Sequence, residues 1–143
     1  MQPLWRSIQF DLLPVLQSNL TVFKEQRQVK LFQSTFWDAD DIVPKSPHNL
    51  FALMKEVEKV HDGKESGPLL VHCLNGCDKS GLYCVLATVI ERLRIEQDVD
   101  IQYTIKQMRN RRPQIIPNYD QFKFLHEAVM EYLKEFDTYV NVK

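Results

Sequence analysis

The segment Leu70–Gly81, which reads Leu-Val-His-Cys-Leu-Asn-Gly-Cys-Asp-Lys-Ser-Gly, constrains this chain more than any other feature. It predicts a β-strand that runs into a tight loop and then into a helix. Cys73 lies at the predicted end of the strand, and Ser80-Gly81 begins the helix. Backbone N–H groups in such a loop and at the helix N-terminus form a site for an anion. We expect the same groups, together with His72, to lower the pKa of Cys73 and make its thiol a nucleophile.

The other strands are predicted from the pattern of apolar residues. Ser7–Leu12 is expected to form a short strand. Asn19–Lys24 and Gln28–Gln33 are expected to form a hairpin around the polar turn Glu25–Arg27. Leu69–His72 is a continuous apolar run of the kind found in strands that are buried on both faces. We therefore expect Leu69–His72 to be a central strand.

The helices are predicted from their spacing and their end signals. Ser46-Pro47 is typical of an N-cap followed by the first helical residue. Ser80–Gln97 begins almost wholly apolar, so we expect this helix to cross the core. Asp100 is a candidate N-cap for a helix that Pro113 ends, and Asn118 begins the last helix. Together these elements predict an α/β fold, with a mixed, twisted sheet flanked by helices.

Composition limits the classes of function that fit this chain. Its 143 residues correspond to one domain, and 44% hydrophobic residues are enough to build a core. The net charge of -1 gives no general attraction to nucleic acid or to anionic membranes. No apolar run approaches the roughly 20 residues that span a bilayer, so we expect a soluble chain. Three cysteines, two of them in one loop, do not predict a disulfide framework and favour a reducing, cytoplasmic compartment.

The order of residues in Leu70–Gly81 resembles the phosphate-binding loop of the protein tyrosine phosphatases. That loop reads His-Cys, five residues, Arg, Ser or Thr, then Gly. The local sequence Val-His-Cys-Leu-Asn-Gly is most similar to the membrane-distal second phosphatase domain of tandem, receptor-type members. The resemblance extends from about Leu31 to Tyr139, and a complete domain of this family is about twice as long as this chain. It therefore implies that residues 1–143 are a single domain, the C-terminal portion of a phosphatase-like domain.

The resemblance makes Cys73 a vestigial nucleophile, with His72 beside it, because Lys79 stands where the family has Arg. Lysine supplies charge but lacks the planar fork that holds two phosphate oxygens. Asp78 repels thiolate and phosphate, since two unit charges about 5 Å apart interact by roughly 3 kcal/mol at an effective dielectric near 20. Asp78 is otherwise a helix cap or an ion-pair partner of Lys79. Cys77 is interpreted as a filler thiol, with oxidative pairing to Cys73 as the alternative. The predicted phosphate-binding residues are Leu74, Asn75, Gly76, Cys77, Asp78, Lys79, Ser80, Gly81 and Gln121.

The family places its general acid two residues after a loop tryptophan, as Trp-Pro-Asp. Here Trp37 is followed by Asp38 and then by Ala39 in the position of the acid. Asp38, Asp40 and Asp41 are candidate acids of a shifted loop, and the alternative is that they are simply solvated. The irregular, acidic composition of this segment indicates a loop.

A third family element carries two glutamines near the phosphate. The position of the first, which orients the hydrolytic water, is Pro117 in this chain, and the second matches Gln121. Arg109, Arg111 and Arg112 precede this segment. We interpret them as an exposed helix end that complements the helix dipole, with binding of an acidic partner as the alternative.

Three catalytic elements are thus replaced together, while the residues around them match the family. We expect an inactive, phosphatase-like (pseudophosphatase) regulatory or scaffolding domain in phosphotyrosine signalling. The alternatives are a weakly active cysteine-dependent protein-tyrosine phosphatase, which is a phosphoric monoester hydrolase, and a phosphotyrosine-binding module. The expected partners are proteins, such as an active phosphatase domain or phosphotyrosine proteins, and not nucleic acid. We expect no metal and no cofactor. The expected location is the cytoplasm, or the cytoplasmic face of the plasma membrane if a parent receptor carries the domain.

Overall fold

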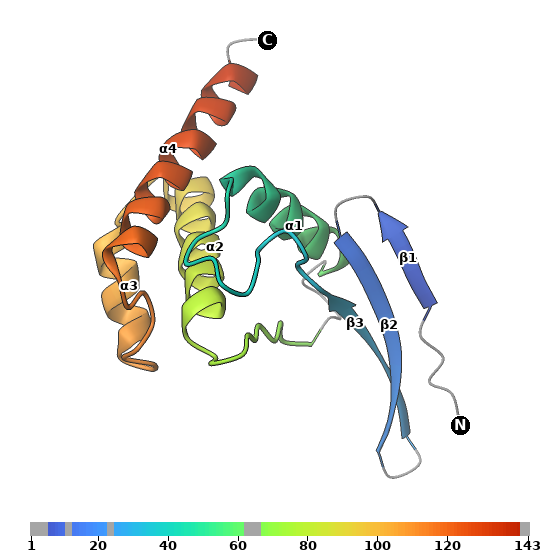
Figure 1. Cartoon of the computed structure of the whole chain (residues 1–143). Helices are drawn as coiled ribbons and strands as arrows, with labels where there is room; N and C mark the ends of the chain where they lie inside the picture. The colour runs from blue at the N-terminus through green and yellow to red at the C-terminus, as the bar shows by residue number, and fades with distance from the viewer. Residues whose placement is uncertain (1–5, 11–12, 23–24, 62–66, 141–143) are drawn as a thin grey trace.

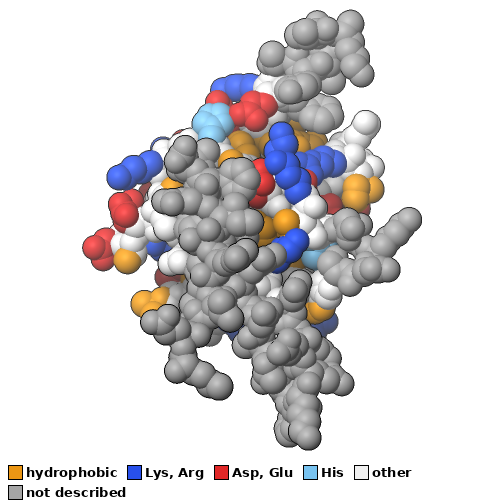
Figure 2. Space-filling view, turned by 90° about the vertical axis from the view of Figure 1, so that its right-hand side faces the viewer, with side chains coloured by type: hydrophobic (Ala, Val, Ile, Leu, Met, Phe, Trp, Pro, Cys, Tyr) orange, Lys and Arg blue, Asp and Glu red, His pale blue; other side chains and the backbone are white. Residues whose placement is uncertain are grey.

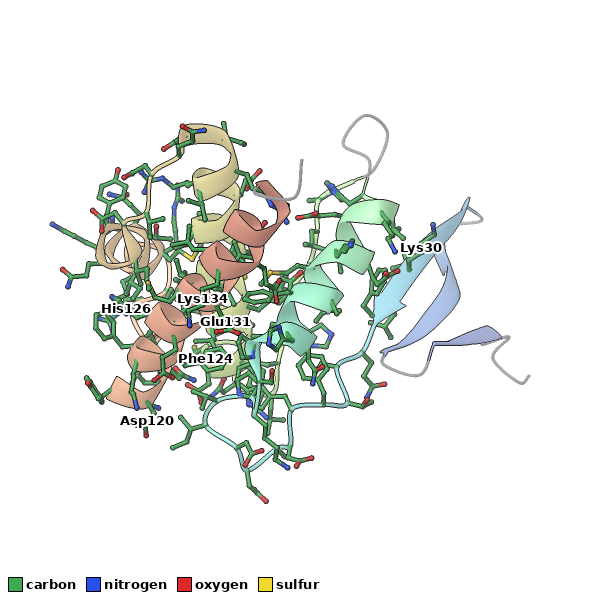
Figure 3. All side chains as sticks on the ribbon, turned by 90° about the horizontal axis from the view of Figure 1, so that it is seen from above. Lys30, Asp120, Phe124, His126, Glu131 and Lys134 are labelled. Carbon is green, nitrogen blue, oxygen red and sulfur yellow. The ribbon has the colours of Figure 1, made fainter. Side chains whose placement is uncertain are left out.

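The structure is a computed structural model that describes residues 6–10, 13–22, 25–61 and 67–140, with side chains described from residue 29 to residue 135. Three strands come first in the chain and four helices follow (Figure 1). Helix α1 lies between the sheet and the other helices, in the view of Figure 1 and from above in Figure 3. The elements are β1 (Arg6–Phe10), β2 (Leu13–Val22), β3 (Glu25–Phe32), α1 (Pro47–Val60), α2 (Asp78–Glu96), α3 (Ile101–Arg109) and α4 (Tyr119–Val140).

The described strands form one antiparallel sheet in the order β1-β2-β3. The predicted hairpin is confirmed, but β3 already begins at Glu25, which pairs with Val22. The predicted turn residues Glu25–Arg27 are instead the first residues of β3. Lys24 of the predicted strand Asn19–Lys24 lies outside the described part of the chain. The predicted strand Ser7–Leu12 corresponds to β1, although residues 11–12 lie outside the described part of the chain. A mixed sheet is not present among the described strands.

Leu69–His72 was predicted as a buried central strand, and this prediction is wrong. The segment has no regular secondary structure, and Leu69 and Leu70 are 51% and 84% exposed. A strand requires a neighbour to accept and donate its backbone hydrogen bonds, and none of the described strands pairs with this segment. Val71 is partly buried against the core. The apolar run therefore does not correspond to a strand in this structure.

The helix ends follow the local signals in the sequence. The Ser46 side chain accepts a hydrogen bond from the backbone N–H of His48, with Pro47 as the first helical residue. The Asp100 carboxylate accepts from the backbone N–H of Tyr103 at the start of α3. Asn118 Oδ1 accepts from the Gln121 N–H at the start of α4. These caps satisfy backbone groups that a helix leaves unpaired at its N-terminus.

Helix α2 crosses the core as predicted, although it begins at Asp78, two residues before the predicted start. Leu82, Val85 and Leu86 are fully buried in it. Helix α2 packs against α3 and α4. A Cβ on Gly81 would lie 2.7 Å from Ile115 Cγ2, so the glycine is what allows the chain after α3 to approach the start of α2. This approach places the Cys73 loop beside the α3–α4 connection.

Charged side chains of both signs are visible from the side of the sheet where the view shows described residues (Figure 2). Figure 2 shows Lys, Arg, Asp and Glu side chains of the described residues interspersed with hydrophobic ones. None of the helices in the described residues is both long and apolar enough to cross a membrane.

Candidate functional site

The Cys73 loop, residues 72–77, leads into the N-terminus of α2. Gly76 adopts a φ of 67°, a left-handed conformation that suits glycine because it has no Cβ. Arg112 Nη1 donates a hydrogen bond of 2.6 Å to the Gly76 carbonyl. A Cβ on Gly76 would meet that same Arg112 nitrogen at 2.6 Å. The loop is therefore closed by a glycine turn and by an arginine from the α3–α4 connection.

The Cys73 thiol is partly buried and lies among hydrogen-bond donors. Burial raises its pKa, but the Ser80 hydroxyl and the backbone N–H groups of Ser80, Gly76 and Cys77 outweigh that effect, so the pKa of Cys73 is lowered. The Cys73 Sγ lies 3.2 Å from Ser80 Oγ. His72 is exposed and is not among the groups that lower the pKa of Cys73. The loop and helix start thus favour a thiolate without help from the histidine.

Asn75 occupies hydrogen-bonding positions that an anion would need. Its Oδ1 accepts from the backbone N–H groups of Cys77 at 2.9 Å and of Asp78 at 3.0 Å. Its Nδ2 donates to the Asp78 carboxylate at 2.5 Å. Two backbone donors at the start of α2 are therefore already paired within the loop. Asp78 is paired with Asn75 and not with Lys79, so the predicted ion pair is wrong.

Lys79, which was predicted to bind phosphate, extends toward the Trp37–Val43 loop. Its Nζ donates to the backbone carbonyl of Trp37 at 3.4 Å and also to that of Asp38. The same Nζ lies 5.1 Å from the centroid of the Trp37 ring, within cation–π range. The hydrogen bonds of the ammonium group thus connect the helix start to this loop.

A hydrogen bond from the Trp37 side chain fixes the shape of the Trp37–Val43 loop. Trp37 is buried, and its Nε1 donates to the Asp41 carbonyl at 2.9 Å. Asp38 and Asp40 are exposed, and Asp38 lies 3.7 Å from Lys45 Nζ. Ala39, in the position of the family's acid, is exposed as well. The carboxylate of Asp38 pairs with Lys45 and not with Cys73.

Gln121 was predicted to bind phosphate, but its side chain supports the same loop. It is 1% exposed, and its Nε2 donates to the Ile42 carbonyl at 3.3 Å. Its Oε1 is buried without a hydrogen-bond partner among the described residues. Pro117, in the position of the family's water-orienting glutamine, is exposed and has no side-chain donor.

The three arginines before Pro113 are exposed, as predicted, and two of them also bond backbone carbonyls. Arg109 donates to the carbonyls of Ile115 and Ile116, at 3.0 and 2.7 Å, and so fixes the α3–α4 connection. Arg112 bonds the Cys73 loop at Gly76. The sequence analysis missed Arg112 as a site residue, since a basic stretch alone does not reveal which carbonyl an arginine reaches.

The remaining predicted site residues have no common role. Leu74 is fully exposed, whereas Ser80 and Gly81 are buried at the start of α2. Cys77 is a free, partly buried thiol and forms no disulfide with Cys73 in this structure. Among the described residues, no group of three His, Cys, Asp or Glu side chains is placed to hold a metal ion.

Comparison with the sequences of known proteins identifies the family of this chain. The sequence profile of the protein-tyrosine phosphatase family matches residues 12–131, a range that begins and ends earlier than the resemblance noted above. The chain is 36% identical over 116 residues to receptor-type tyrosine-protein phosphatase S of Gallus gallus, covering 80% of this chain and 8% of that protein. It is 30% identical over 119 residues to receptor-type tyrosine-protein phosphatase alpha of Homo sapiens, covering 83% and 15%. It is 34% identical over 116 residues to tyrosine-protein phosphatase Lar of Drosophila melanogaster, covering 80% and 6%. The chain thus spans a small part of each of these relatives.

Proposed function

This chain belongs to the protein-tyrosine phosphatase family, and we propose that it acts within it as a non-catalytic regulatory or scaffolding domain in phosphotyrosine signalling. In this proposal its counterpart is the membrane-distal second phosphatase domain of a receptor-type parent. The domain then acts at the cytoplasmic face of the plasma membrane. In this proposal its partner is an active phosphatase domain, whereas direct binding of phosphotyrosine proteins belongs to the alternative of a phosphotyrosine-binding module.

The observation that carries the proposal is the position of Lys79. Phosphoryl transfer needs a cation that holds the equatorial oxygens of the phosphoryl group while charge develops on them. The Lys79 ammonium instead bonds the carbonyls of Trp37 and Asp38 and lies near the Trp37 ring. To bind phosphate it must give up these contacts, and it then offers a point charge in place of a fork.

The occupied loop supports the same conclusion. Asn75 already accepts the N–H groups of Cys77 and Asp78, so an incoming phosphate must displace its side chain. The Asp78 carboxylate bonds Asn75 at the same helix start and opposes a dianion there. Binding and charge stabilisation are therefore both weakened at the point where the family needs them.

The family's general acid and its water-orienting glutamine are also replaced in this chain. A leaving tyrosine needs an acid, and Ala39 in the acid position cannot supply a proton. A phosphocysteine intermediate needs an oriented water, and Pro117 has no donor to orient one. Loss of either step slows turnover even where the nucleophile is intact.

One observation favours a second candidate, a weakly active phosphatase. The lowered pKa of Cys73 increases the fraction of thiolate near neutral pH, and the thiolate is the nucleophile. In this alternative Cys73 attacks phosphorus and the leaving group departs unassisted. Substrates with good leaving groups would then react while phosphotyrosine peptides would not.

The test combines turnover and binding with one set of proteins. Hydrolysis of para-nitrophenyl phosphate and of a phosphotyrosine peptide is measured for the wild type and for Cys73→Ser, and binding of the same peptide is measured by calorimetry. The proposal predicts that the wild type and Cys73→Ser show the same negligible hydrolysis and no specific peptide binding. Hydrolysis that disappears in Cys73→Ser favours the weak enzyme. Peptide binding without hydrolysis favours a phosphotyrosine-binding module.

A further inference from the structure

A groove lies between residues 40–47 and the first turns of α4, on residues distinct from the Cys73 loop. It consists of two adjoining hollows of about 390 and 420 Å³, which share Asp41, Val43, Phe124 and Glu127. Figure 3 shows Asp120 and Phe124 in the first half of α4, beside the connection that leads from β3 to α1. Hollows of this size accommodate one or two amino-acid side chains.

The lining combines an apolar base with charged edges. Val43, Pro44 and Phe124 supply the apolar part, and Pro44 and Phe124 are buried. The helix α4 and the β3–α1 connection both contribute, so the groove is made by elements that are about 80 residues apart in sequence. Its shape is fixed because Gln121 bonds Ile42 and Trp37 bonds Asp41.

The charges of the groove do not cancel. Lys123 lies 3.4 Å from Glu127, and Lys45 lies 3.7 Å from Asp38, so both lysines in the lining already have acidic partners. Asp40, Asp41 and Asp120 also line the groove, and no cation lies within ion-pair distance of them among the described residues. The lining therefore contains four acidic side chains and two lysines, and three of the carboxylates have no ion-pair partner among the described residues.

A buried amide supports one wall of the groove. Gln121 follows Asp120 on α4, and its Nε2 donates to the carbonyl of Ile42, which lines the groove. This bond joins the two elements that form the groove.

From this combination we propose that the groove binds a basic segment of a partner protein, in which Arg or Lys side chains alternate with apolar ones. The cationic groups pair with Asp41 and Asp120, and an apolar side chain lies against Val43 and Phe124. Charge complementarity fixes the sign of the occupant, since an acidic segment would meet three carboxylates. The bound segment covers Asp40 and Asp41, which belong to the Trp37–Val43 loop. In the same loop the carbonyls of Trp37 and Asp38 accept hydrogen bonds from Lys79.

The test uses a fluorescein-labelled arginine–leucine hexapeptide with strictly alternating residues, and a glutamate–leucine hexapeptide as its counterpart. Binding to the 143-residue chain is followed by fluorescence anisotropy at low and at high NaCl concentration. The double variant Asp41→Asn/Asp120→Asn keeps the side-chain shapes and removes two charges. The matched control is Glu91→Gln, an exposed acid on α2 that does not line the groove.

We expect the basic peptide to bind the wild type and the double variant to bind it about fivefold more weakly, since each exposed ion pair contributes modestly. High salt weakens binding to the wild type more than to the double variant. Equal affinity of the wild type and the double variant, equal binding of the acidic peptide, or an equal loss in Glu91→Gln would each overturn the proposal.

An NMR titration of the wild-type chain makes the result independent of how well the variants fold. The basic peptide is expected to shift the backbone amide signals of residues 40–43 and 120–127. Shifts confined to residues 72–81 would place the peptide at the Cys73 loop and contradict the groove. The peptide titration and the phosphatase assay can fail independently of each other, because turnover at Cys73 would leave the groove and its peptide binding unchanged.

Discussion

Replacing Lys79 by methionine tests whether this residue fixes the Trp37–Val43 loop. Lys79→Met keeps the length of the side chain and removes its charge. The change deletes the hydrogen bonds to the carbonyls of Trp37 and Asp38 and the contact at 5.1 Å with the Trp37 ring. Hydrogen bonds to charged groups contribute about 1.5–3 kcal/mol, and an exposed cation–π contact about 0.5–1 kcal/mol. Because Lys79 is only half-buried, water replaces part of this, and we expect a loss of about 1–2 kcal/mol in the free energy of unfolding.

Thermal unfolding followed by circular dichroism measures this loss. For a chain of this size, a loss of about 1–2 kcal/mol lowers Tm by roughly 3–8 °C. The matched control is Lys106→Met, which changes an exposed lysine on α3 and should leave Tm nearly unchanged. If Lys79→Met and Lys106→Met have the same Tm, Lys79 does not fix the loop. The main argument that Lys79 is held away from a bound phosphate is then lost.

Three further predictions concern the loop and the start of α2. Gly81→Ala should lower the free energy of unfolding by about 1–3 kcal/mol in urea titrations, because its Cβ would lie 2.7 Å from Ile115 Cγ2; unchanged stability would mean that the contact relaxes freely. Asn75→Ala should tighten phosphate binding severalfold, measured by amide chemical shifts, since it frees two backbone donors; weaker binding would show that Asn75 helps the anion. Ser80→Ala should raise the pH midpoint of Cys73 alkylation by iodoacetamide, because the Ser80 hydroxyl is the largest of the groups that lower this pKa; an unchanged midpoint would exclude that role.

The helices could be predicted because their signals are local. The Ser46 and Asp100 caps and the apolar start of α2 each lie within a few residues of the structure that they determine. The helix α2 begins earlier than predicted because Asn75 pairs the N–H groups of Cys77 and Asp78 and so stabilises an earlier start.

The failures concern pairing between distant segments. The apolar run at Leu69–His72 carried no information about a neighbouring strand, and periodicity alone cannot supply one. The contact from Lys79 to Trp37 joins residues about 40 positions apart, as does the bond from Arg112 to Gly76. A motif identifies which residue types surround Cys73, but only the fold shows that Lys79 and Gln121 extend to the neighbouring loop.

The most direct test of a non-catalytic domain is turnover before and after restoring the missing groups. Para-nitrophenyl phosphate and phosphotyrosine peptide hydrolysis is measured for the wild type, for Lys79→Arg and for Lys79→Arg/Ala39→Asp/Pro117→Gln, each with and without Cys73→Ser. The account predicts no Cys73-dependent turnover in the wild type and incomplete rescue by Lys79→Arg alone, because Ala39 and Pro117 remain. Robust wild-type turnover that disappears with Cys73→Ser would contradict it.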